Sequence, residues 1–413
     1  MTCELHNVAR LRGWVEGTFA TDGTGTLANY TDIPAIEGSV VFTGKPTMLD
    51  PEYLQQHVDG YPEQQIGPET TTLSFSMNLA PSGAEAGDAV AAQQSALGMI
   101  LATVMGGENL GTGDTVQAGS PSATVFDVSA AAARNLTDGA AVGLLTGASS
   151  ALEAREIQQQ STNELTLKLA LTAAPNATDV VYAAATYYPD QNPLGSMQFI
   201  IEGAEQDDRW LALGMQLESI AITTPLNQLP RVTFNFKGPK YLHGDDTAGV
   251  LTGSALGTAS YTLVQPIHAD GEFRFPTVGV DTLAGTAIDI SDLTINMQLG
   301  YLDVPSPQGT EGIAKYRRNR GRPLASGSFT TFYEDEQRWD DRDAKTKKAI
   351  FFQMGNAAGS TMLLSFPRTQ IQDVARIDAG GLAGTRVDWA TMLDADTTAD
   401  NDQANAAVRF HLL

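Results

Sequence analysis

The residue types that do most enzyme chemistry are scattered along this chain and form no motif. Its five histidines match neither the HExxH nor the HxxxH spacing of zinc sites; they are His6, His57, His243, His268 and His411. The acids of the HGDD segment at 243–246 are better explained as a solvated loop, since no further spaced ligands follow. We therefore predict no catalytic residue, no metal site and no cofactor. A hydrolase carboxylate pair stays an open alternative in a chain with 48 acidic residues.

Bulk composition narrows the function classes further. The 413 residues exceed one ordinary core, so two or three domains are expected. A net charge of −23 argues against sequence-specific nucleic-acid binding, which needs a basic footprint. The chain has a single cysteine, no apolar run near the roughly 18 residues of a membrane span, and no signal-peptide core at its N-terminus. We expect a soluble protein made in a reducing compartment, with turn-rich β structure.

A pattern of strands occurs twice. The segment 196–237 reads as three strands, and its residues 210–219 alternate as in a sheet with one buried face. A similar pattern returns at 349–389. Phe199 and Gly203 match Phe351 and Gly355 at an offset of 152 (351 − 199), and Arg231, Val232 and Phe234 match Arg386, Val387 and Trp389 at an offset of 155 (386 − 231). Phe75 is matched to Phe329. We infer a duplicated chain.

The elements required around these strands give the same order in both copies: strand, loop, strand, helix, strand, strand, strand. The first helix is expected at Asp88–Met105, capped by Asp88 and ended by Gly106, and the second, short and charged, at 336–348. Five short strands between 111 and 189 predict an inserted small β-barrel or sandwich.

The predicted fold is mainly β, with sandwich- or barrel-forming sheets and one helix per repeat. The expected domains are a first repeat at 1–110 with 190–238, the inserted module at 111–189, an inter-repeat linker at 239–287, and a second repeat at 288–413. Within the linker, 260–263 and 271–275 could form strands.

Two loops of opposite charge occupy matching places, each joining the first two strands of its repeat. The first, 50–69, carries Asp50, Glu52, Asp59, Glu63 and Glu69; the second, 315–322, carries Lys315, Arg317, Arg318, Arg320 and Arg322. A solvated loop or a nucleic-acid patch could explain the basic cluster alone. We favour a third interpretation, in which the two loops meet when copies of the protein stack and so fix register and orientation.

Element order and texture resemble those of phage tail tube proteins. The resemblance rests on RLRGWVEGT at 10–18 leading to the strand at 38–49, on the strand around Leu73 and Phe75 followed by the Ala/Leu-rich helix, and on ATYYP at 185–189 leading to QFIIE at 198–202. The duplication resembles the siphophage subset with two tail-tube domains per chain. Family members commonly carry an extra β-module on the tube exterior, which the segment 111–189 resembles.

The resemblance implies a structural virion protein, not an enzyme. Its chains would form trimeric, pseudo-hexameric rings that stack into a tube made in the host bacterial cytoplasm. Its partners would be itself, the tape measure protein and tail completion or terminator proteins, with no membrane contact. DNA would pass through an acidic lumen without specific binding. The candidate lumen carboxylates are Glu202, Glu218, Asp373, Asp378 and Asp388. The alternative is a non-enzymatic β-rich binding module, either a phage head or neck protein or a carbohydrate-binding adhesin.

Overall fold

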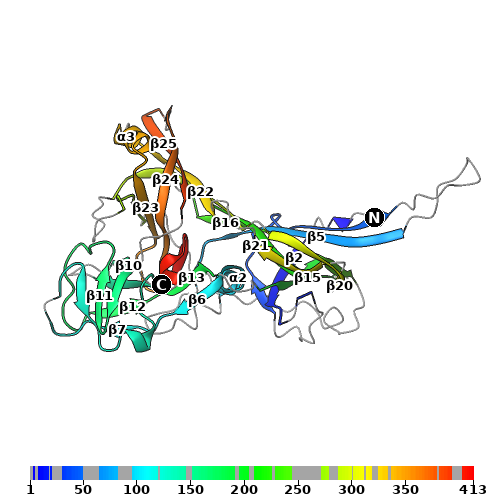
Figure 1. Ribbon diagram of the computed structural model, residues 1–413, viewed down its shortest axis with the longest axis horizontal. Helices are drawn as coiled ribbons and strands as arrows, with labels where there is room; N and C mark the ends of the chain where they lie inside the picture. The colour runs from blue at the N-terminus through cyan, green and yellow to red at the C-terminus, as the bar shows by residue number, and fades with distance from the viewer. Residues whose placement is uncertain are drawn as a thin grey trace, which may run out of the picture.

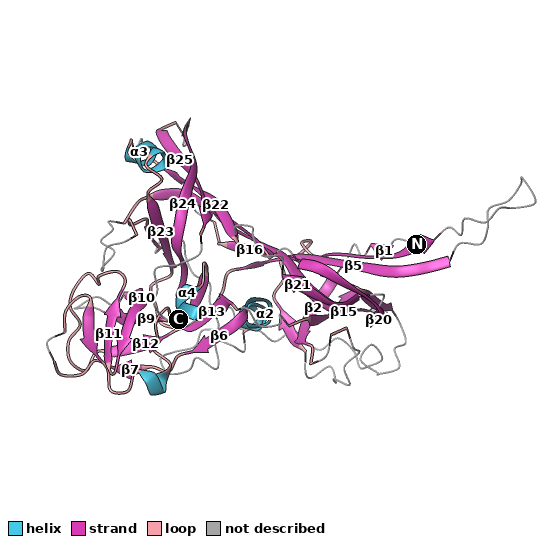
Figure 2. Cartoon of the chain, viewed as in Figure 1, coloured by secondary structure: helices cyan, strands magenta, loops and turns pink. Residues whose placement is uncertain are grey.

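The computed structural model is mainly β, with strands far outnumbering its short helices (Figure 2). It describes residues 3–4, 8–17, 19–20, 30–49, 65–81, 95–119, 121–145, 151–190, 195–203, 209–225, 228–243, 271–278, 287–299, 301–310, 313–318, 324–333, 336–378, 381–392 and 402–413.

Two four-stranded antiparallel sheets with the same strand connectivity form the body of the molecule. In the first, the spatial order is β4 (Val41–Leu49), β5 (Gln65–Asn78), β16 (Arg231–Gly238) and β15 (Arg209–Pro225). In the second, it is β19 (Ile290–Gln298), β22 (Ala325–Thr331), β25 (Ala383–Thr391) and β24 (Met362–Asp378). β15 pairs with β19 and joins the two into one continuous half-barrel sheet (Figure 1).

Each repeat has one long strand, β15 or β24, that extends beyond this sheet into a second set of pairings. The first half of β15 pairs with β14 (Met197–Gly203) and β17 (Lys240–His243), and β2 (Val8–Val15) and β3 (Thr31–Ile33) extend that set. The first half of β24 pairs equivalently with β23 (Lys347–Met354) and β26 (Arg409–Leu412), and β18 (Glu272–Arg274) pairs with β23. Both predicted copies therefore have the same arrangement.

The large core cluster lies between these layers and unites both repeats. Phe75, Phe199 and Phe236 form one aromatic group within it, with ring centroids of Phe199 and Phe236 4.8 Å apart. The prediction of one buried face for 210–219 is wrong for residues 210–217. Residues 209–217 are buried on both sides, because that half of β15 lies inside the sandwich.

The helices are shorter than predicted. α2 spans Ala96–Met105, and the Ser95 side chain caps it by accepting from the Gly98 amide at 3.0 Å. The predicted start at Asp88 is wrong in that respect, and Asp88 itself lies outside the described residues. The predicted stop is correct, since Gly106 has φ +81°. α3 spans Gln337–Asp343, within the predicted 336–348.

The inserted module is a small closed barrel. Its sheet order is β7 (Asp114–Thr115), β12 (Val180–Ala183), β9 (Ala141–Leu145), β10 (Leu152–Ser161), β11 (Glu164–Leu167) and β8 (Val125–Asp127), with the short helix η2 at Ala132–Arg134. A bridge between Val116 and Val128 links the two end strands and closes the ring of strands. The barrel encloses its own apolar core and lies beside β23 and β24, away from β5 (Figure 1).

The strand pairings place two boundaries differently from the prediction. β13 (Ala185–Pro189) pairs with β6 (Gly106–Leu110) and β26 of the main sheet, so the barrel's own strands end at Ala183. The segment 239–287 is not only a linker, because it contributes β17 to the first repeat and β18 to the second. The expected strand at 260–263 lies outside the described residues.

A buried ionic network connects the barrel to the C-terminal segment. Glu156 of β10 lies against Arg409 of β26, and the Lys168 ammonium is 2.7 Å from its carboxylate. Arg409 also donates to the main-chain carbonyls of Gln403 and Ala404 in α4 (Asp402–Asn405). Arg409 and Glu156 are each 1% exposed or less, so the contact is closed to solvent.

Candidate functional site

The half-barrel sheet has one apolar face, in the core, and one polar face made mainly of hydroxyl and amide side chains. In the first repeat this face is cross-linked by hydrogen bonds from strand to strand. The Ser74 hydroxyl donates to the Asn235 Oδ1 at 2.8 Å, the Asn235 Nδ2 donates to Ser219 at 2.9 Å, and Ser76 and Thr233 share a bond of 2.7 Å. These contacts satisfy the side chains without charge.

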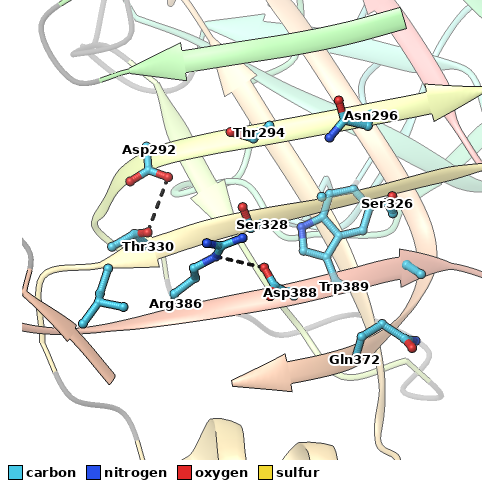
Figure 3. Close-up of a pocket in the computed structure, with 13 residues that line it drawn as sticks. Asp292, Thr294, Asn296, Ser326, Ser328, Thr330, Gln372, Arg386, Asp388 and Trp389 are labelled. Carbon is cyan, nitrogen blue, oxygen red and sulfur yellow. Dashed lines mark hydrogen bonds and ion pairs between the residues drawn. The ribbon is translucent and has the colours of Figure 1, made fainter. Parts of the chain in front are cut away.

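The polar face of the second repeat is hollowed into an open trough of about 730 Å³ (Figure 3). Asp292 of β19 accepts from the Thr330 hydroxyl at 3.4 Å, and Arg386 donates to Asp388 at 3.0 Å within β25. Hydroxyls and amides from Thr294, Asn296, Ser326, Ser328 and Gln372 line much of the rest, and Gly327, Ile377, Trp389 and Ala390 complete the lining. The trough is a broad polar groove along a sheet, unlike an enclosed ligand cavity.

Strand register relates the two polar faces residue by residue. Thr223 pairs with Arg231, and Ala375 pairs with Arg386. The offsets are 152 (375 − 223) and 155 (386 − 231), so the structure reproduces both offsets found in the sequence. One match needs correction: Asn78 pairs with Arg231 and Thr330 with Arg386, an offset of 252 (330 − 78), so Phe75 corresponds to Gly327 rather than to Phe329.

The two outer strands of the half-barrel have edges with few partners. Among the described residues, no strand pairs with the outer edge of β24 beyond Gln370, where its pairing with β23 ends. Its equivalent in the first repeat is the β15 edge that binds β19. At the opposite end of the sheet, the described pairing on the outer edge of β4 is with β1 (Cys3–Glu4), at Thr43 and Gly44. An unpaired edge is a template for another strand.

The described polar face is not dominated by acids, contrary to the expected acidic wall. Asp292, Asp373 and Asp388 lie on it, together with Arg231, Lys237 and Arg386. The face is therefore polar and close to charge balance. The acidic excess of the whole chain resides elsewhere.

The five candidate lumen carboxylates are placed in different environments. Glu202 is 1% exposed and lies 3.3 Å from Arg209 and 3.9 Å from Arg12, so it cannot line an open wall. Asp378 accepts from the Gly381 amide at 2.5 Å and shapes the turn after β24. Asp373 pairs with Asp388 and so lies on the polar face, with its carboxylate 3.7 Å from Arg342 of α3. Glu218 is exposed at an irregularity of β15, and Asp388 alone lines the trough.

The two charged loops extend from β-hairpins at matching places. Asp50, Glu52, Asp59, Glu63, Arg320 and Arg322 lie outside the described residues, and Glu69 is half-buried on β5 opposite Pro46. Lys315, Arg317 and Arg318 lie on β21 (Ile313–Arg318), which pairs with β20 (Tyr301–Thr310), so this part of the basic cluster is a strand rather than a loop.

The sequence interpretation missed the polar ladder itself. Its signal is present, because Ser74 and Ser76 alternate with Leu73, Phe75 and Met77 along β5. The alternation by itself predicts only which face of the strand is apolar; the hydroxyls on the opposite face carry the further signal. Hydroxyl residues alternating with large apolar ones over several strands indicate a sheet with a wet, weakly charged face.

The described residues contain no group of three or more His, Cys, Asp or Glu side chains placed to hold a metal ion. Over the same part of the chain, no helix is long and apolar enough to cross a membrane. No protein-family model matches the chain, and no curated protein sequence matches it.

Proposed function

We propose that this protein is a structural subunit that polymerises into stacked rings forming the tail tube of a siphophage. The observation that carries this proposal is the internal junction of β15 with β19. It joins two equivalent four-stranded sheets side by side and leaves equivalent edges at the two ends. A second such junction, made between chains, would continue the same sheet.

The register of that junction between chains follows from the internal one. Ala221 pairs with Asn296 inside the chain. Ala221 corresponds to Asp373 by the offset of 152, and Asn296 corresponds to Val41, since these two pair with the equivalent residues Ser326 and Ser74. Asp373 of one chain would therefore lie opposite Val41 of the next. Both are exposed, at 67% for the Asp373 side chain and 56% for Val41.

Repeating the junction closes a barrel, which removes the sheet edges that would otherwise aggregate. Closed cyclic symmetry is the common outcome for identical subunits, and a ring of three chains would contain six repeats. The polar face would line the lumen. A wall of hydroxyls and amides, with Arg386 paired to Asp388, offers DNA few free cations and therefore little counterion-release affinity.

The inserted barrel fits the exterior of such a tube. Its own strands close on themselves, so it offers the neighbouring chain no sheet edge. In this assembly the protein acts without catalysis, cofactor or metal. Its partners are further copies of itself, the tape measure protein and tail completion or terminator proteins, and DNA passes without specific binding.

Cysteine cross-linking tests the lateral contact. In a Cys3→Ser background, Val41→Cys with Asp373→Cys should give covalent closed oligomers on oxidation, which non-reducing gels and negative-stain electron microscopy would resolve as rings. The matched control is Ala221→Cys with Asn296→Cys, which should cross-link within one chain and stay monomeric on the gel. Failure of the first pair to cross-link between chains, together with monomers at every concentration and salt, would refute the proposal.

A further inference from the structure

The ends of the half-barrel strands form two rims with different chemistry. Both long hairpins, β4–β5 and β20–β21, leave the same rim of the sheet. β4 and β5 are joined beyond the pair Leu49 and Gln65. The β20–β21 hairpin connects β19 to β22 at the same rim, where Met297 pairs with Ala325. The short turns between β15 and β16 and between β24 and β25 lie at the opposite rim, where Arg231 pairs with Asn78. The hairpins and the short turns therefore mark opposite ends of each strand.

The rim of short turns exposes large apolar side chains in a repeated way. Leu229 in the β15–β16 turn is 41% exposed, and Leu382 in the equivalent β24–β25 turn is 58% exposed. Tyr333, just after β22 at the same rim, is 44% exposed. Each repeat thus presents one exposed leucine in the same turn. A polar side chain would serve an ordinary solvated turn as well or better.

We propose that Leu229, Leu382 and Tyr333 form the axial docking surface of the ring, and that its occupant is the hairpin rim of a second copy of this chain. This inference rests on the proposed tube. In a tube built by translation, every ring presents one rim to the opposite rim of the next. The partner of the leucine rim is then the rim that carries the β4–β5 and β20–β21 hairpins.

The chemistry of the hairpin segments fits that occupant. They contain Met48, Leu49, Tyr301, Leu302 and Val304 in the sequence, besides their charged residues. The internal repeat adds a geometric reason. Leu229 and Leu382 are separated by the distance between one repeat and the next, and the two hairpins of a second copy are separated by the same repeat distance.

This arrangement replaces the contact expected between the acidic 50–69 loop and the basic 315–322 segment. Both leave the same rim, so a head-to-tail stack cannot bring one against the other between successive rings. Opposite net charges on the two segments of one rim would fix which hairpin seats on which turn of the next ring.

The test is the double variant Leu229→Asp with Leu382→Asp, compared with Val180→Asp. Val180 is 42% exposed on β12 of the inserted barrel, far from either rim, and is the matched control. Burial of these two half-exposed leucines would stabilise the contact between stacked rings. Without it, the protein concentration needed to form tubes should rise roughly tenfold or more in the double variant. Electron microscopy should find single rings for it and stacked tubes for wild type and control.

The outcomes separate the two proposals. Wild-type protein that forms neither rings nor tubes overturns the proposed function. Wild-type tubes accompanied by equally long tubes of the double variant, at the same concentration, overturn the docking surface and leave the proposed function standing. Loss of the rings themselves in the double variant, with circular dichroism unchanged, would place these leucines in the lateral contact and also overturn the inference.

Discussion

The contact of Arg409 with Glu156 should be the strongest single tie between the inserted barrel and the C-terminal segment. Both side chains are fully buried, and Glu156 also accepts from the Ser365 hydroxyl and the Lys168 ammonium. Arg409→Met keeps the apolar bulk but leaves a buried carboxylate short of a partner, and it strips two main-chain carbonyls of α4 of their donor. Breaking one member of a buried ion pair costs about 3–5 kcal/mol, so a loss of about 4 kcal/mol in unfolding free energy is expected.

The matched control is Arg386→Met. Arg386 also makes an ion pair, at 3.0 Å to Asp388, but its side chain is 52% exposed and that of Asp388 is 39% exposed. Solvent screens such a pair, and its loss should cost less than about 1 kcal/mol. Urea unfolding followed by tryptophan fluorescence, with midpoint and slope compared, measures both variants.

A double variant distinguishes attraction from an uncompensated charge. Adding Glu156→Gln to Arg409→Met removes the stranded carboxylate, so the double variant should be more stable than Arg409→Met alone. The reasoning would be refuted if Arg409→Met cost no more than Arg386→Met. In that case the barrel is held by its apolar contacts with Phe351 and Leu363, and the ionic network is neutral overall.

Three further results are expected. Burial holds the pKa of His411 down to about 3 against its ordinary 6.5, and the Glu156 carboxylate opposes this shift. The stability that depends on neutral His411 is therefore present above pH 6.5 and is lost as the pH falls toward 3. In His411→Asn protein, the slope of unfolding free energy against pH between 6.5 and 5 should be smaller by about 1.4 kcal/mol per pH unit, and an unchanged slope would argue against a buried neutral imidazole. Burial opposes ionisation of Glu156, but the charges of Arg409 and Lys168 outweigh it and hold its pKa near 2 against its ordinary 4.5. In a His411→Asn background, stability should therefore fall by about 3 kcal/mol more between pH 4.5 and 2 than in the same background with Glu156→Gln added. Gly327→Ala should lower the free energy of unfolding by about 1–3 kcal/mol, because the new β-carbon would collide with the Thr294 carbonyl oxygen and lie 2.7 Å from the Trp389 ring. Gly17 has open space around it, so Gly17→Ala is the control and should stay within about 0.5 kcal/mol of wild type in thermal unfolding.

The duplication was readable from the sequence because it rests on local pattern. Alternation of apolar residues, one β-rich segment after another, and two offsets of 152 and 155 survive in the residues themselves and match the strand register at Thr223 and Ala375. The mainly β class, the short module after α2 and the end of α2 at Gly106 follow from the same kind of signal.

Only the tertiary structure determines the properties that depend on which strands lie beside each other. Glu202 alternates along its strand like a surface carboxylate, yet β2 and β15 flank that strand and bury it. The pairing of β15 with β19 and the common rim of both hairpins join residues far apart in the chain, and so does the position of the β24 edge, which has no strand partner beyond Gln370 among the described residues. A period-two pattern fixes which residues share a face; it does not fix whether that face meets solvent, core or a neighbouring chain, because those are set by non-local pairing and layer stacking.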